Sequence, residues 1–193
     1  PYIAVTFVIW GIISTVVIDS CNALTENEQL LRHVSLPRSL FTCRVIARNF
    51  IVAAHNFIII PIVFIWFGVG INANILWILV GLALLIVNAF WLAYFLSILC
   101  ARFRDVPQIV TSIIQVVFFV TPVMFLPDQL ARRGLAAVRW NPFANLLEVV
   151  RDPLLGAAPS TWALVSCAIM AVVGLALVVP FAGRYAPRVV YWL

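Results

Sequence analysis

Five long runs of apolar residues limit what this chain can fold into. A helix needs roughly 20 mainly apolar residues to cross the hydrocarbon core of a bilayer. The runs cover residues 2–18, 50–69, 75–99, 107–126 and 161–181. They are continuous, whereas barrel strands would alternate apolar and polar residues. We therefore predict an all-α integral membrane protein with a bundle of about five transmembrane helices.

The composition agrees with lipid as the main solvent. Of the 193 residues, 65% are hydrophobic and 10% are charged, whereas a soluble domain carries about a quarter charged residues. We expect residues 1–193 to form a single transmembrane domain. The basic residues are all Arg and cluster beside the apolar runs, which argues against nucleic-acid binding. The scattered cysteines form no CxxC pair and indicate neither a metal site nor a disulfide framework.

The arginines predict an orientation. If every apolar run spans, residues 19–49, 100–106 and 182–193 share one side with eight arginines, and 70–74 and 127–160 share the other with four. Cytoplasmic loops carry the excess of Arg and Lys, so 19–49 is predicted to be a cytoplasmic loop and 127–160 an outer segment. This places Pro1 outside, and we expect an additional upstream span, six in the full protein. Pro61, Pro122 and Pro180 are expected to bend or break their helices.

The polar residues of the predicted spans do not indicate a driving force for transport. No Asp, Glu or Lys lies near the middle of a predicted span, where an ion-coupled carrier usually needs an ionisable group. His55 could relay protons, although a structural role is the favoured interpretation. A P-loop requires a Lys, and the chain has none. We expect this chain not to be an enzyme, and any ATP to be used by another subunit.

A short amphipathic helix is predicted between residues 25 and 34. Glu26 and Glu28 precede Arg32 and His33, an order that suits the helix dipole. Leu30, Leu31 and Val34 add a narrow apolar stripe at helical spacing, and Pro37 ends the run. Such a helix could lie on lipid or dock into a cytosolic partner.

The outer segment is predicted to contain a re-entrant or interfacial helix. Asn141-Pro142 is typical of an N-cap followed by Pro at the first helical position. Pro153 and Gly156 should interrupt the helix, and Glu148 and Arg151 are spaced to pair. Asp128, Glu148 and Asp152 are interpreted as members of solvated ion pairs rather than as an acid/base cluster.

Aromatic residues near the outer end allow two interpretations. Phe125, Trp140 and Phe143 could border the exit of a glycan path, because rings stack on the apolar faces of sugars. They could equally be ordinary interfacial anchors.

Several separated motifs resemble one family. They are Ala101-Arg102-Phe103-Arg104-Asp105-Val106-Pro107-Gln108, Thr121-Pro122-Val123-Met124-Phe125, Asn141-Pro142-Phe143 and Arg151-Asp152-Pro153-Leu154-Leu155-Gly156, with Asn22, Glu26-Asn27 and Leu36-Pro37 in the first loop. Their order resembles permeases of type-2 ABC exporters. The branch they resemble most exports polysaccharides and polyol phosphates, as O-antigen and teichoic acid carriers do.

The resemblance implies a homodimeric permease in the bacterial plasma (inner) membrane. Two copies of a separate ATPase subunit would bind ATP and Mg, this chain would hold no cofactor or metal, and the substrate would be a lipid-linked glycan such as a lipopolysaccharide precursor. The family's coupling helix would fall on about Glu26–Val34, with Glu26, Asn27, Leu30, Leu31 and Val34 as coupling residues. Its outer re-entrant helices would fall on about 128–156.

Two other functions stay open at this point. One is an ABC exporter of a drug or small lipid, whose path should be narrower and less aromatic. The other is an integral membrane transferase that acts on lipid-linked sugars through the outer carboxylates.

Overall fold

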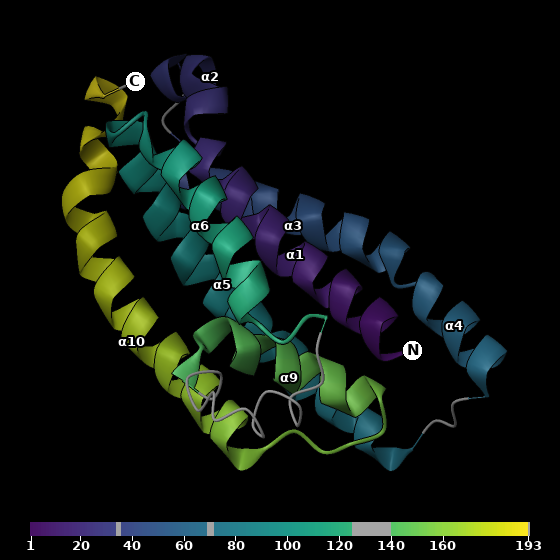
Figure 1. Cartoon of the computed structure of the whole chain (residues 1–193). Coiled ribbons are helices and arrows are strands. Elements are labelled where there is room, and N and C mark those ends of the chain that lie inside the picture. Colours follow the sequence, from purple (N-terminus) through teal and green to yellow (C-terminus); the bar gives the residue numbers. More distant parts are fainter. Residues whose placement is uncertain (34–35, 69–71, 125–139, 193) are drawn as a thin grey trace.

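The computed structural model describes residues 1–33, 36–68, 72–124 and 140–192. In these ranges all regular structure is helical (Figure 1). The elements are α1 (Tyr2–Asn22), η1 (Thr25–Asn27), α2 (Glu28–His33), α3 (Arg38–Asn56), α4 (Ile59–Phe67), η2 (Ala73–Leu76), α5 (Trp77–Arg102), α6 (Val106–Val120), α9 (Pro142–Leu154), α10 (Thr161–Tyr185) and η3 (Ala186–Tyr191).

The predicted all-α membrane fold is confirmed, with one span shorter than expected. Four helical segments are long and apolar enough to cross a membrane: Tyr2–Asn22, Arg38–Phe67, Ala73–Arg102 and Thr161–Tyr191. The predicted span 107–126 corresponds to α6, which has only 15 residues. At 1.5 Å per residue it is roughly 22 Å long, shorter than a hydrocarbon core of roughly 30 Å.

The helix that contains the second predicted span starts twelve residues before it. Residues 38–49 were assigned to a loop, but α3 starts at Arg38. Phe41 and Val45 are buried while Arg44 and Arg48 are exposed, so the arginines lie on the open side of the helix. They lower the local hydropathy without interrupting the helix.

The three prolines act differently. The helix breaks between α3 and α4, just before Pro61, which has no N–H to donate to the Phe57 carbonyl. Ile60 donates to that carbonyl instead, at 3.1 Å. α6 ends at Val120, before Pro122, whereas α10 continues through Pro180 without a break. The expected helix break is therefore confirmed at Pro61 and Pro122, and the helix is not broken at Pro180.

α5 is the central helix, with α1, α9 and α10 packed against it (Figure 1). At Gly81 the α9 backbone comes so close that a Cβ atom would collide with the Val149 carbonyl. The Asn88 amide donates to the Cys167 carbonyl of α10 at 3.1 Å and accepts from the Trp91 indole at 3.0 Å. Small residues and a satisfied amide are common means of joining helices in lipid.

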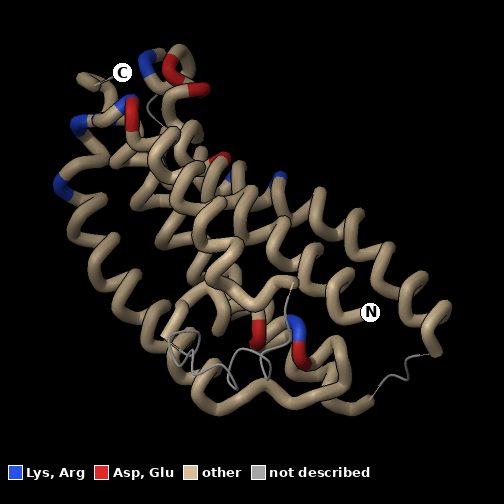
Figure 2. Tube along the Cα trace, viewed as in Figure 1, with Lys and Arg blue, Asp and Glu red and all other residues tan. Residues whose placement is uncertain are grey.

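Charged residues gather toward two ends of the bundle (Figure 2). We call one the α2 end: η1, α2, η3, the residues between α5 and α6, the last turns of α1, α5 and α10, and residues 38–48 of α3. We call the other the α9 end: α9, the start of α1 and the last turn of α6. Between these ends, α5 carries no charge before Arg102, α6 carries none, and α10 carries none before Arg184. This distribution suits a hydrocarbon layer between the two ends.

Candidate functional site

At the α2 end, the predicted apolar stripe divides between two surroundings. Leu31 is 5% exposed and belongs to a buried cluster with Leu24, Phe41, Ile98, Ala101, Ala182, Ala186 and Val189. Leu30 is 41% exposed and faces away from that cluster. Val34 lies outside the described residues. Leu31 therefore anchors α2 to the spans, whereas Leu30 stays exposed.

The outward surface of this segment is mainly polar. A groove of about 710 Å³ is lined by Thr25, Glu26, Asn27, Glu28, Gln29, Leu30 and His33. Glu28 pairs with Arg32 at 2.8 Å one turn later, and Asn27 donates to the Ala23 carbonyl at 2.9 Å. Leu31 is buried in the protein's own core, so Leu30 is the described residue of the stripe that could contact either lipid or a partner.

A second polar contact holds the α2 end together. Asp19, near the end of α1, accepts from Arg48 at 2.8 Å and from Asn49 at 2.9 Å on α3. The two helices that flank η1 and α2 in the sequence are thereby joined.

At the α9 end, the predicted helix start is confirmed. The Asn141 side chain accepts from the Phe143 amide at 3.0 Å, and Pro142 occupies the first turn. The same side chain donates to the Thr121 hydroxyl at 3.0 Å, so the cap also fixes the end of α6. The predicted interruption at Pro153 comes late, because α9 continues through it to Leu154.

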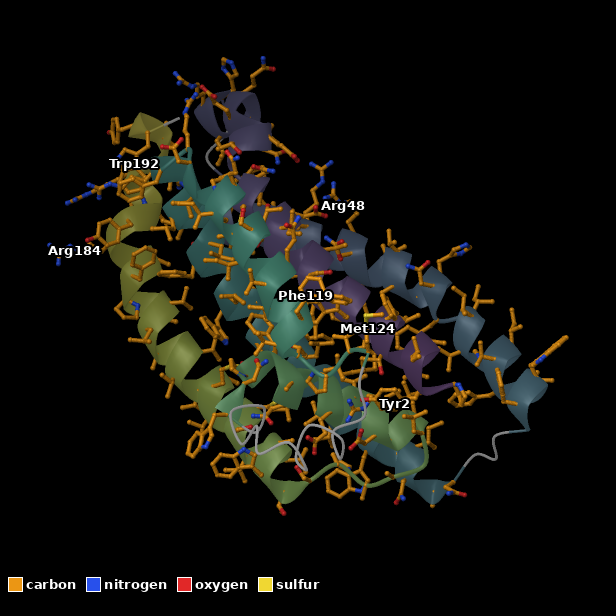
Figure 3. All side chains as sticks on the ribbon, viewed as in Figure 1. Tyr2, Arg48, Phe119, Met124, Arg184 and Trp192 are labelled. Atoms are coloured by element: carbon orange, nitrogen blue, oxygen red, sulfur yellow. The ribbon has the colours of Figure 1, made fainter. Side chains whose placement is uncertain are left out.

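Arg151 is the centre of a buried polar cluster, contrary to the predicted solvated pair with Glu148. Its side chain is 4% exposed and lies 2.7 Å from Asp152. It donates to the Tyr2 hydroxyl at 2.9 Å, and Tyr2 (labelled in Figure 3) donates to the Pro122 carbonyl at 3.1 Å. Glu148 instead accepts from the Ser160 amide at 3.2 Å. The cluster ties the start of α1 and the end of α6 to α9.

The environment of Asp152 is unfavourable to charge. Burial raises the pKa of its carboxyl, and Arg151 opposes that rise. Asp128 lies outside the described residues. Glu148 and Asp152, the described carboxylates of the α9 end, thus both have partners within the protein, which does not favour the acid/base cluster of a transferase.

The structure separates the predicted aromatic residues. Trp140 is 72% exposed and contacts Trp162 of α10 edge to face, with ring centroids 5.0 Å apart. Phe143 is half-buried and packs on Trp10 of α1 at 6.3 Å. Phe125 lies outside the described residues. Trp162 was not singled out from the sequence, although its position just after the Ser160 N-cap of α10 is a usable signal.

Beside Trp140 lies an apolar groove of about 390 Å³ between α9 and α10. It is lined by Trp140, Pro142, Asn145, Trp162, Val165, Ser166, Cys167, Ile169, Met170 and Val173. Trp140 therefore borders a surface groove, whereas Phe143 supports the core.

His55 and the four cysteines do not form a shared functional site in the described part of the chain. His55 is exposed near the break between α3 and α4. Cys21, Cys100 and Cys167 are buried, Cys43 is exposed, and all four are free. In the described ranges, no three His, Cys, Asp or Glu residues gather as metal ligands would.

The Arg151 cluster makes a testable stability prediction. Arg151→Gln leaves the Asp152 carboxylate without its cation, and breaking a buried pair costs roughly 3 kcal/mol or more. The folded-state pKa of Asp152, already raised, should rise further. The loss should therefore be smallest below the ordinary pKa of Asp in the unfolded chain, grow as the pH rises from there through the raised folded-state pKa, and level off above it. Thermal unfolding of the purified protein across pH measures this.

The double variant Arg151→Gln, Asp152→Asn is the control. It has no carboxyl to titrate at this place, so the additional pH dependence should vanish. Equal pH profiles for the single and double variants would contradict the assignment.

Comparison with known proteins agrees with these features. Residues 1–155 match the model of the ABC-2 type transporter family. The chain is 22% identical over 148 residues to the O-antigen export system permease protein RfbA of Klebsiella pneumoniae. That match covers 74% of this chain and 56% of the relative, so the chain spans little more than half of that protein's length. Since the family match covers most of its residues, the chain belongs to the ABC-2 type transporter family and is a multi-pass membrane component of a transporter.

Proposed function

We propose that this chain is the permease of an exporter that moves a lipid-linked polysaccharide or polyol-phosphate polymer out across the bacterial plasma membrane. The family is that of a transporter's membrane component, which works with an ATPase subunit. The similarity to an O-antigen export permease supports a glycan as the substrate class. ATP and Mg would bind to two copies of the separate ATPase.

The observation that carries this proposal is the way α2 packs: Leu31 is buried against the bundle, and a polar groove faces outward. The partner would meet the polar groove and Leu30, while Leu31 fixes α2 to α5 and α10 through the buried cluster. A push on the groove would then move packed helices as rigid elements. Glu26 and Asn27 lie on the groove wall and are proposed contacts, as is Val34 beyond the described residues.

The orientation follows from charge. The α2 end carries most of the described arginines, so we place it in the cytoplasm and the α9 end outside. α6 exposes Ile109, Ile113 and Val116 along one face, with Gln108 and Ser112 beside them. We propose that a second copy of the permease stands opposite this face and that the sugars pass between the copies.

We propose Trp140 and Phe125 as borders of the exit on the outer side. The exposed indole of Trp140 is available to stack on a sugar face. Phe143 has a different role in this proposal: it packs on Trp10 and supports α9 from within.

The orientation can be measured by single-cysteine labelling in intact cells, after replacement of the native cysteines. His33→Cys should react with a membrane-impermeant maleimide only after the membrane is broken, because position 33 is exposed at the α2 end. Ala158→Cys, exposed at the α9 end, should react in intact cells. The opposite pattern would invert the topology.

Neighbouring leucines give a sharp test of the docking surface. Leu30→Asp should reduce co-purification of the ATPase about tenfold while the permease level stays normal, because a charge placed in an apolar contact costs more than 1 kcal/mol. Leu31→Asp should lower the level of the permease itself, because it puts a charge into the core. Quantitative blots of both subunits separate the two effects.

Leu40→Asp, the same substitution at an exposed leucine of α3 that does not line the groove, is the matched control and should change neither value. Normal ATPase recovery with Leu30→Asp would remove this surface as the docking site.

The exit proposal makes contrasting predictions for two aromatic residues. Trp140→Ala should slow surface glycan export by about tenfold at normal permease level, because the variant loses the stacking of a sugar face on the ring, taken as similar to the about 1–3 kcal/mol of a stacked nucleobase. Phe143→Ala should instead destabilise the protein by about 2–3 kcal/mol through lost packing. Export, membrane abundance and ATPase assembly should be scored together.

If Trp140→Ala lowers abundance and export in proportion, the ring is an interfacial anchor. If it leaves all three values normal, the exit assignment is wrong.

A further inference from the structure

A row of aromatic rings leads from the apolar part of the bundle to the α2 end. Phe95 of α5 contacts Phe181 of α10 at 5.0 Å between centroids, and Phe181 contacts Tyr185 at 4.9 Å. Tyr185 contacts Trp192, just after η3, at 6.3 Å. All four rings are only half-buried, so the row forms part of the surface between α5 and α10.

Arginines stand at the polar end of this row. The Arg102 guanidinium lies over the rings of Trp192 and Phe103, 5.3 and 5.2 Å from their centroids. Arg184 lies over Tyr185 at 6.0 Å. Figure 3 shows Arg184 and Trp192 at the same end of α10. Ring contacts on its flat face fix the plane of a guanidinium and leave its N–H groups free at the edge.

These arginines have no anionic partner among the described residues. At the α2 end the described ion pairs are Arg32–Glu28 and Arg48–Asp19. Arg102, Arg184 and Arg188 are exposed, and none lies within 4.0 Å of a described carboxylate. The surface thus combines a fixed positive group, unpaired positive charge and an apolar row that runs toward the hydrocarbon.

We propose that this surface binds an anionic phospholipid, with the phosphate on Arg102 and Arg184 and an acyl chain along Tyr185, Phe181 and Phe95. The planar fork of arginine matches a phosphate diester, and basic residues beside a span attract anionic lipid at about 1 kcal/mol each. The aromatic row supplies the apolar contact that free phosphate would not use. This site shares no residue with the lining of the ATPase groove, although η3 packs against α2, and it does not depend on the identity of the exported substrate.

Binding of phosphatidylglycerol and phosphatidylcholine to the full-length permease, delipidated in detergent, can be titrated by native mass spectrometry. Arg102→Gln should weaken phosphatidylglycerol binding about fivefold, the equivalent of one lost basic contact. Arg104→Gln removes the same charge two residues away, where no ring contact is seen, and should leave binding within about twofold. Phosphatidylcholine should bind weakly to all three proteins.

Three results would overturn the site. They are equal losses for Arg102→Gln and Arg104→Gln, equal affinity of the unaltered permease for both lipids, and complete displacement of phosphatidylglycerol by inorganic phosphate. The first would mean attraction by net charge alone, and the last would mean a free-anion site. Arg102→Lys keeps the charge but loses the planar fork, so it should still weaken binding of phosphatidylglycerol. It replaces Arg102→Gln in the binding test if Arg102→Gln lowers the melting temperature of the protein.

Discussion

Packing against α5 is the constraint on which both ends of the molecule depend. Near its start, Gly81 lets the α9 backbone come into direct contact. Near its end, Ile98 and Ala101 hold Leu31 of α2 in the buried cluster. The two contacts lie on one helix of 26 residues, roughly 39 Å long. If α2 couples to the ATPase as proposed, its displacement would reach α9 by way of η3, the buried cluster and α5.

The sequence predicted what depends on local chemistry. Apolar length is enough to find the spans, because in hydrocarbon a helix satisfies every backbone hydrogen bond within itself. The Asn141 cap was also predictable, because it too is a local interaction: the amide that it accepts from is two residues away. The start of α3 was not predictable from hydropathy. Arg44 and Arg48 resemble loop residues by hydropathy, and only the tertiary packing of Phe41 and Val45 shows that the helix continues.

The candidate site depended on contacts that spacing does not determine. Leu30 and Leu31 are adjacent, and only the position of η3 and α10 decides that Leu31 is the anchor. Trp140 and Phe143 are three residues apart, which on a helix would favour a shared face. Asn141 lies between them with an extended backbone, at φ −73° and ψ 114°, so helical spacing does not apply. The rings consequently contact different helices.

Arginine serves opposite purposes at the two ends because its surroundings differ. Arg151 is buried, so its charge requires Asp152 and the Tyr2 hydroxyl beside it, and the result is a fixed joint between three helices. Arg102 is exposed, so its charge needs no partner from the protein, and ring contacts alone hold its plane. The Arg151 pair cancels one positive charge at the α9 end, and the Arg32–Glu28 and Arg48–Asp19 pairs cancel two at the α2 end. The proposed orientation therefore rests on the number of arginines at each end and not on their pairing.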